Sequence, residues 1–135
     1  MRFLAIIVIN CLNFFFFQHI IFSQKIGIEK FEFISPKAES FFHNPNTCII
    51  IRYGETFDFQ SIISTNFKIH GDISGKHEGK CILSTDKKTI IFEPFQPFTF
   101  GEKVRVNIIK SIKTISGDSL PDIQYSFSIR DSIIL

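Results

Sequence analysis

Apolar side chains recur at every second position in several short runs after residue 25, and this spacing most limits what the chain can fold into. Such a period is that of a β-strand, whose successive side chains point to opposite faces, whereas a helix needs a period of about 3.6. In the run 103–109, for example, Val104, Val106 and Ile108 fall on one face and polar residues on the other. No long amphipathic helical pattern follows residue 25, so the sequence predicts an all-β chain.

Glycine, proline, asparagine, aspartate and serine cluster between these runs, at intervals suited to short strands. Seven strands are expected, over residues 30–34, 48–53, 67–70, 80–84, 89–92, 103–109 and 124–129. The fourth and fifth should form a hairpin, residues 71–79 a glycine-rich connection, and residues 56–66 one short helical turn. In the second strand, Ile49, Ile51 and Tyr53 should face inward. Such a series suits two packed antiparallel sheets, a β-sandwich.

Residues 1–24 differ in composition from the rest, because Arg2 is their one charged residue. A basic start, an apolar stretch over residues 3–17 and the small Ser23 form the pattern of a signal peptide. We expect cleavage near Ser23 or Gln24, which leaves residues 25–135 as one domain. The alternative is an uncleaved membrane anchor, although polar residues interrupt the apolar run. The leader predicts a secreted, periplasmic or cell-surface protein.

The rest of the chain is nearly neutral, since 14 basic residues stand against 13 acidic ones once Arg2 is removed. Lysines and arginines are interspersed with acids along the length, whereas nucleic-acid binding shows a dense basic stripe. The charge pattern therefore predicts no nucleic-acid partner. It predicts contact with a membrane through the leader alone, if the leader is not cleaved.

Two cysteines, Cys48 and Cys81, lie outside the leader, and an exported protein meets an oxidising environment in which disulfides persist. A bridge needs Cα atoms within about 7 Å of each other, which a sequence does not establish. The sequence therefore leaves the bridge open, with two free, half-buried thiols as the expected state.

An ordered series of short patterns extends over most of the chain. These patterns are Ser35-Pro36, Ile49-x-Ile51-x-Tyr53, Phe67-x-Ile69-x-Gly71, Thr89-Ile90-Ile91-Phe92-x-Pro94, Phe98-x-x-Gly101, Val104-x-Val106 and Gly117-x-x-Leu120 followed by Phe127. In this order they resemble the SbsA-like bacterial immunoglobulin-like domain, over roughly residues 31 to 130. The resemblance implies an immunoglobulin-like β-sandwich of about seven antiparallel strands, and such domains look like spacers, stalks and adhesive modules of exported proteins. One departure is Val104, where the family often has a tyrosine.

The sequence contains no recognisable catalytic arrangement. Residues 71–76 and 75–80 bring glycines and lysines together, but neither segment has the spacing of a phosphate-binding loop. A Gly-x-Ser-x-Gly elbow is absent, and the closeness of His77 and Cys81 in sequence does not establish an activated thiol. We therefore expect no catalytic residues and no cofactor, and we interpret the chain as a protein other than an enzyme.

Metal ligands are not indicated either, because the histidines outside the leader lack the short spacing that directs two of them to one ion. His70 and His77 could still converge with Asp72 across their connection. A calcium site through Asp72, Glu78 or Asp118 stays open, although the regular acidic spacing of a calcium-binding loop is missing. We expect no metal site.

The most unusual stretch contains Phe92, Phe95, Phe98 and Phe100. Phe92 and Phe98 fall at core positions of the resembled family, which leaves Phe95 and Phe100 as candidates for exposure and possible ligand contacts. The expected function is that of a non-catalytic secreted or cell-surface module with a structural, spacer or adhesive role. It could be the N-terminal part of a larger exported protein. The alternative is a glycan- or protein-binding module that uses these aromatics, with a cell-wall or surface glycan or protein as its partner.

Overall fold

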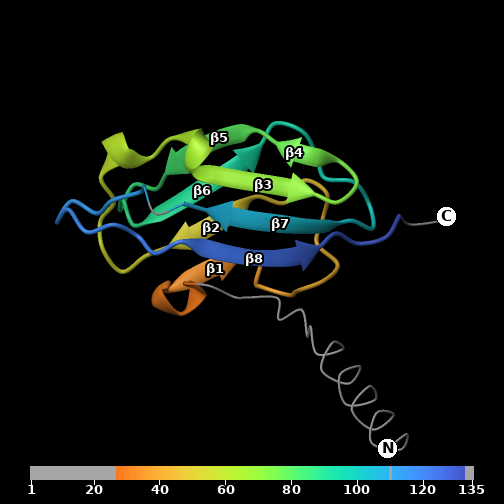
Figure 1. Cartoon of the computed structure of the whole chain (residues 1–135), viewed down its shortest axis with the longest axis horizontal. Helices are drawn as coiled ribbons and strands as arrows, with labels where there is room; N and C mark the ends of the chain where they lie inside the picture. Colours follow the sequence, from red (N-terminus) through yellow and green to blue (C-terminus); the bar gives the residue numbers. More distant parts are fainter. Residues whose placement is uncertain (1–26, 110, 133–135) are drawn as a thin grey trace, which may run out of the picture.

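A computed structural model describes residues 27–109 and 111–132, in which eight strands form two antiparallel four-stranded sheets (Figure 1). The first sheet contains, in order, β1 (Phe33–Ser35), β2 (Ile49–Arg52), β6 (Thr89–Pro94) and β5 (Gly79–Leu83). The second contains, in order, β4 (Gly75–His77), β3 (Phe67–Gly71), β7 (Lys103–Ile108) and β8 (Ile123–Ser128). The all-β sandwich predicted from the alternating pattern is confirmed, and the predicted leader, residues 1–24, lies outside the described residues.

The order of strands is that of an immunoglobulin constant-type domain with one strand added. In that fold the first, second, fifth and fourth strands form one sheet, and the third, sixth and seventh form the other. Here β1–β2–β6–β5 packs opposite β3–β7–β8, and β4 is the added strand beside β3. Figure 1 shows the sheet with β3, β7 and β8 in front of the sheet with β2 and β6.

The core lies between the two sheets and consists of the inward-facing residues of each strand. On β2, Ile49 and Ile51 are fully buried, and on β7 the same holds for Val106. The rings of Phe67 on β3 and Phe92 on β6 stack across the two sheets with centroids 5.1 Å apart. Burying a side chain of this size stabilises the fold by about 1.5–3 kcal/mol relative to leaving it exposed. The period-two pattern thus translates directly into two apolar faces that pack together.

Three 3-10 helices occur in the described residues: η2 (Ile28–Lys30), η3 (Phe59–Ser61) and η4 (Ser64–Asn66). The sequence predicts one helical turn within residues 56–66, whereas the structure has two there. Asp58 caps η3 by accepting a hydrogen bond from the second amide after it, at 3.1 Å. The Phe67 amide then ends η4 by donating to the Ser64 carbonyl, and β3 begins. No helix in the described residues is long and apolar enough to cross a membrane.

The connection predicted over residues 71–79 contains the strand β4, so this part of the prediction is wrong. Gly75 has a φ of 80°, a left-handed conformation that glycine adopts at little cost, and it turns the chain back along β3. β4 then pairs with β3 from Gly71 opposite Gly75 to Ile69 opposite His77. His77 is the one buried side chain of β4. The strand therefore has no apolar alternation to reveal it.

The segment between the first two strands runs along the outer edge of β8 and covers it. The Glu39 amide donates to the Ser126 carbonyl at 2.7 Å, and the His43 amide donates to the Ser128 carbonyl at 3.1 Å. The Ser126 hydroxyl donates to the Glu39 carboxylate at 2.8 Å, so Ser126 is buried although alternation places it on the outer face. A bare strand edge is open to pairing with other chains. This segment blocks such pairing at β8.

Cys48 and Cys81 are both free thiols. Cys81 lies on β5 and Cys48 directly precedes β2, with β6 between these two strands. Two strand spacings amount to roughly 10 Å, which exceeds the distance that a disulfide spans. The bridge that the sequence leaves open is therefore not formed between these residues.

Candidate functional site

A groove opens at one edge of the sandwich, where β3 of one sheet and the start of β5 of the other both line it. Its volume is about 600 Å³, within the range of sites that bind small molecules. The residues that line it include Ser64, Thr65, Lys68, His70, Lys76 and Phe95. The groove is the candidate binding site of the described residues.

The groove exists because β4 ends early and the chain crosses to the opposite sheet. β4 pairs with β3 as far as His77, and the chain enters β5 at Gly79. A Cβ atom at Gly79 would overlap the Glu93 carbonyl oxygen, so the crossing needs glycine. The Phe95 amide donates to the Glu78 carbonyl at 2.9 Å. This bond holds Phe95 beside the crossing and the groove.

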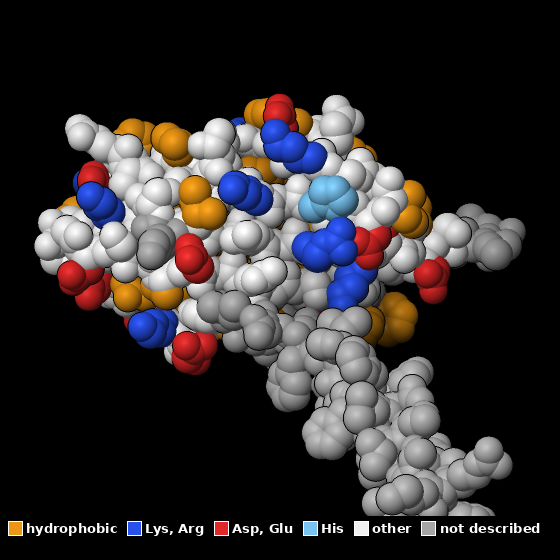
Figure 2. Space-filling view, in the orientation of Figure 1, with side chains coloured by type: hydrophobic (Ala, Val, Ile, Leu, Met, Phe, Trp, Pro, Cys, Tyr) orange, Lys and Arg blue, Asp and Glu red, His pale blue; other side chains and the backbone are white. Residues whose placement is uncertain are grey.

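Three basic side chains stand in one row across the outer face of the second sheet. His70 on β3 lies directly opposite Lys76 on β4 and Arg105 on β7. The two cations of this row, Lys76 and Arg105, lie on either side of His70, and each has an acidic partner. Asp72 pairs with Arg105 at 2.8 Å, and Glu78 pairs with Lys76 at 3.1 Å. Figure 2 shows a histidine on this face, with Lys and Arg side chains around it.

Two residues of the groove keep polar groups available for a ligand. Lys68 is exposed, and in the part of the chain that the structure describes it has no ion-pair partner. Arg105 contacts His70 Nδ1 at 3.3 Å, and because a guanidinium can only donate, Nδ1 accepts. The neutral imidazole of His70 then carries its proton on Nε2. This N–H can donate to a bound molecule.

The two phenylalanines predicted as possible ligand contacts are both exposed, but they lie in different places. The Phe95 side chain is 63% exposed and lines the groove. Phe100 is 45% exposed, and the Arg130 guanidinium lies over its ring at 5.7 Å from the centroid, a cation–π contact. Phe92 and Phe98 are buried, as predicted. The structure therefore brings Phe95, and not Phe100, to the groove.

A buried polar network joins the β3–β4 turn to the start of β7. Glu102 is 1% exposed and accepts hydrogen bonds from the amides of Ile73 and Ser74 at 2.9 Å and of Thr99 at 2.7 Å. It also accepts a bond from the Ser74 hydroxyl at 2.7 Å, and this hydroxyl contacts His77 Nε2 at 2.6 Å. Burial by itself raises the pKa of Glu102, but the four hydrogen bonds lower it more, so its pKa lies below the ordinary value.

This network contains a serine, a histidine and a carboxylate, but not in the order of a nucleophilic triad. A triad places the histidine between the other two, so that it takes the serine proton while the acid orients it. Here Ser74 lies between His77 and Glu102, and His77 Nδ1 faces the Gln96 carbonyl at 3.2 Å. A Cβ atom at Gly71 would overlap the Glu102 carboxylate. The order of these contacts is that of a packed structural network and not that of a nucleophilic triad.

The structure does not bring the candidate metal ligands together. His70 is exposed on the outer face of β3, whereas His77 is buried on β4. Asp72 and Glu78 each pair with a basic side chain, and Asp118 belongs to the connection between β7 and β8. No three His, Cys, Asp or Glu side chains gather closely enough to hold a metal ion within residues 27–109 and 111–132.

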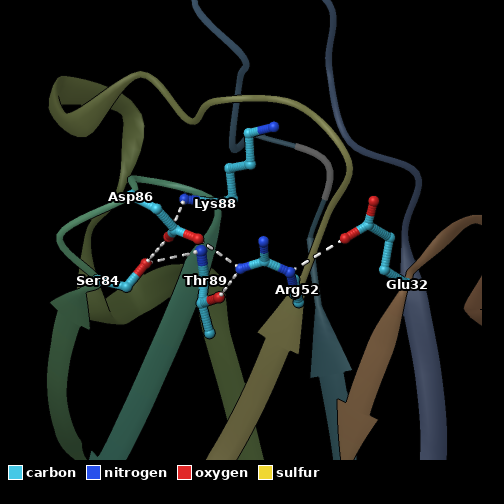
Figure 3. A network of polar contacts seen from close by, with 6 residues as sticks. All are labelled: Glu32, Arg52, Ser84, Asp86, Lys88 and Thr89. Atoms are coloured by element: carbon cyan, nitrogen blue, oxygen red, sulfur yellow. Dashed lines mark hydrogen bonds and ion pairs between the residues drawn. The ribbon is translucent and has the colours of Figure 1, made fainter.

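A second polar cluster surrounds Arg52 at the end of β2 (Figure 3). Its Nε donates to Glu32 at 3.0 Å, and its Nη1 donates to Asp86 at 2.7 Å and Thr89 at 2.9 Å. The Ser84 hydroxyl and Arg52 both donate to Asp86 and hold its pKa well below the ordinary value. These side chains are largely open to water, where ion pairs contribute little stability. The cluster ties the β5–β6 turn to β2.

Sequence reasoning did not single out Lys68 or Arg105, and it considered Lys76 only as part of a phosphate-binding loop that the spacing excludes. One signal was available, because the alternation of β3 puts Lys68 and His70 on the same outer face. Their nearness to Lys76 and Arg105 depends on strand order and register, which the sequence does not give directly.

No family model and no curated protein matches this chain. Solved structures resemble it in fold. The N-terminal part of the bacterial S-layer protein SbsC is 17% identical, with a TM-score of 0.55 over 71% of this chain and 24% of the chain in that structure. A longer S-layer structure, rSbsC(31-844), gives the same identity and TM-score over 14% of its chain. CopC from Methylosinus trichosporium OB3b is 15% identical, with a TM-score of 0.51 over 78% of this chain and 96% of that one.

These values show a shared fold. The chain spans less than a quarter of each S-layer structure, so its counterpart there is one β domain among several. In contrast, it matches nearly the whole length of CopC. The same sandwich therefore occurs both as a module of a long surface protein and as a protein of a single domain.

Proposed function

We propose that this chain is a non-catalytic immunoglobulin-like module of a bacterial cell surface or envelope, with a structural or spacer role. The observation that carries the proposal is the likeness in fold to one domain of an S-layer protein. The predicted leader at residues 1–24 supports an exported location. The SbsA-like character of the domain belongs to this proposal as well, since it rests on the order of short sequence patterns.

The internal polar groups support a role without catalysis. Ser74, His77 and Glu102 bond to one another and to the backbone, in an order that activates no nucleophile. Burial raises the pKa of the Cys81 thiol to about 11, which keeps it protonated and unreactive near neutral pH. We therefore assign Ser74, His77, Glu102 and Cys81 a role in the stability of the fold and not in catalysis.

Export can be tested with the full chain carrying a C-terminal tag in a bacterial host. Cells are fractionated, and the N-terminus of the recovered protein is determined by mass spectrometry. We expect the tag in the envelope fraction or the medium, with an N-terminus close to residue 24. A matched variant with Ile7→Asp and Ile9→Asp should stay in the cytosol with its leader intact. An intact leader on the parent chain in the cytosol would overturn the proposed location.

A second candidate function is ligand binding, favoured by the position of Phe95. An aromatic side chain that is 63% exposed beside a groove of about 600 Å³ is suited to contact a bound molecule. Sedimentation with isolated bacterial cell walls tests this role, and Phe95→Ala should leave more of the protein in the supernatant than the parent. Equal sedimentation of the two proteins would remove Phe95 from any binding role.

A further inference from the structure

The charges of the residues that line the groove indicate which kind of ligand it can bind. Lys68, His70 and Lys76 line it, and Glu78 is the single acid among the lining residues. Glu78 already pairs with Lys76, whereas Lys68 has no ion-pair partner in the described residues. With Lys76 and Glu78 paired, the ammonium group of Lys68 leaves the groove with an unbalanced positive charge that an anionic ligand would neutralise. The charge of the groove is therefore complementary to an acid.

The remaining lining groups suit a sugar. The exposed ring of Phe95 offers a flat apolar surface on which the C–H face of a sugar ring can stack. Ser64 and Thr65 on η4 provide exposed hydroxyl groups that both donate and accept hydrogen bonds. His70 adds one directed donor, its Nε2–H. Hydroxyl groups of a glycan match this mixture of donors and acceptors.

The backbone beside the groove does not favour an added peptide strand. Strand addition depends on unpaired main-chain groups along a sheet edge. β3 extends beyond its last pair with β4, but there the Phe67 amide already donates to the Ser64 carbonyl. A peptide would have to displace η4 to reach this donor. The groove is thus better suited to a ligand held by side chains.

We propose that the groove between Phe95 and the basic residues Lys68, His70 and Lys76 binds a carboxylate-bearing glycan. The sugar ring stacks on Phe95, and the carboxylate lies between the two lysine ammonium groups. This inference rests on the second proposed function, ligand binding, and specifies its ligand. It is independent of the export experiment, which tests location alone.

Isothermal titration calorimetry tests the inference with the full chain, purified as the host processes it. Trigalacturonate is the probe, and maltotriose is the neutral trisaccharide of similar size. We expect trigalacturonate to bind at least about tenfold more tightly than maltotriose, and to bind more weakly as salt is raised. Lys68→Gln and Lys76→Gln should each weaken binding by about threefold to tenfold, and Phe95→Ala by about tenfold.

Two matched variants change similar residues outside the groove. Lys113→Gln removes an exposed cation, and Phe100→Ala removes the other exposed phenylalanine of the same stretch. Both should leave the affinity for trigalacturonate unchanged. The melting temperature of every variant is measured first, so that a loss of fold is not taken for a loss of contact.

Several outcomes would overturn the inference, and they are distinguishable from one another. Maltotriose that binds as tightly as trigalacturonate, with a loss on Phe95→Ala, would keep ligand binding but remove the acidic specificity. Hexaglutamate that binds more tightly than trigalacturonate would assign the groove to an acidic peptide. If none of the three probes gives a heat of binding in the titration, the groove does not bind a glycan. The export experiment would still test the envelope location independently.

Discussion

The Ser74 hydroxyl donates to the Glu102 carboxylate at 2.7 Å, across a separation of 28 residues in the sequence. This bond joins the turn between β3 and β4 to the residue that precedes β7. Ser74 is itself exposed, whereas Glu102 is almost completely buried. A buried carboxylate stabilises a protein when its bonds replace those it made to water, and here four donors do so.

Glu102→Ala should destabilise the domain strongly. The substitution leaves three amides and a hydroxyl without their acceptor and removes a buried side chain, which should lower the free energy of unfolding by about 3 kcal/mol. Urea unfolding followed by circular dichroism measures the change. Glu78→Ala is the control, because Glu78 is exposed and forms a surface ion pair with Lys76. Equal midpoints for the two variants would contradict a structural role for Glu102.

The same carboxylate makes stability depend on pH in a defined direction. The pKa of Glu102 in the folded protein lies below its ordinary value of 4.5, because hydrogen bonds favour the charged form more than burial disfavours it. A group of this kind contributes stability that is complete above the ordinary pKa and is lost as the pH falls through the folded pKa. Glu102→Gln should therefore be less stable than the parent at neutral pH.

The difference between Glu102→Gln and the parent should shrink as the pH falls from about 5 to about 3. Asp86, whose pKa is also lowered, is present in both proteins, so its contribution cancels in the comparison. Urea midpoints at a series of pH values give the difference directly. A gap that stays constant over this range would show that the charge of Glu102 is not what stabilises the fold.

Ile51→Asp tests the inward face of β2. Ile51 is fully buried and lies opposite Ile34 on β1 and Ile90 on β6, both of which are buried as well. An ionised carboxylate at this position would be buried without a partner, so the variant should fail to fold. Ile82→Asp on β5, where the side chain is 41% exposed, should still melt cooperatively. A melting curve of Ile51→Asp that matches the parent would refute the inward assignment.

The elements that the sequence predicted well are those whose pattern is local. On β7, Val104, Val106 and Ile108 alternate with polar residues, and all three are buried as expected. Such strands can be recognised from their own residues, because the face that packs against the core must be apolar at every second position. β4 has no such alternation. Its buried residue is His77, which contacts Ser74 and Gln96 outside the strand.

The candidate site was predicted in part. Phe95 was a candidate for exposure because Phe92 and Phe98 fall at core positions of the resembled family, and the structure shows Phe95 exposed. The basic row needs the register of three strands, which no local pattern contains. No sequence pattern singled out Glu102. Its burial follows from donors that lie up to 29 residues away.

The two cysteines should differ in reactivity toward iodoacetamide. Burial raises the pKa of both thiols above the ordinary 9.0, and for Cys81 on β5 it reaches about 11. Because the thiolate is the reactive form, Cys81 at pH 7.5 should react about 100-fold more slowly in the native protein than in urea. Cys48 directly precedes β2 and is less deeply buried than Cys81, so it should react faster. Peptide mapping by mass spectrometry separates the two sites.

The result in urea is the control, since unfolding exposes both thiols equally and should make their rates similar. A native Cys81 that reacts as fast as Cys48 would contradict its burial against the core beneath β5. The same samples test the redox state: two free thiols take up two labels in urea without a reductant. A protein that takes up no label at these positions until it is reduced would contain a Cys48–Cys81 bridge, and β2, β6 and β5 could not then be neighbours in their present order.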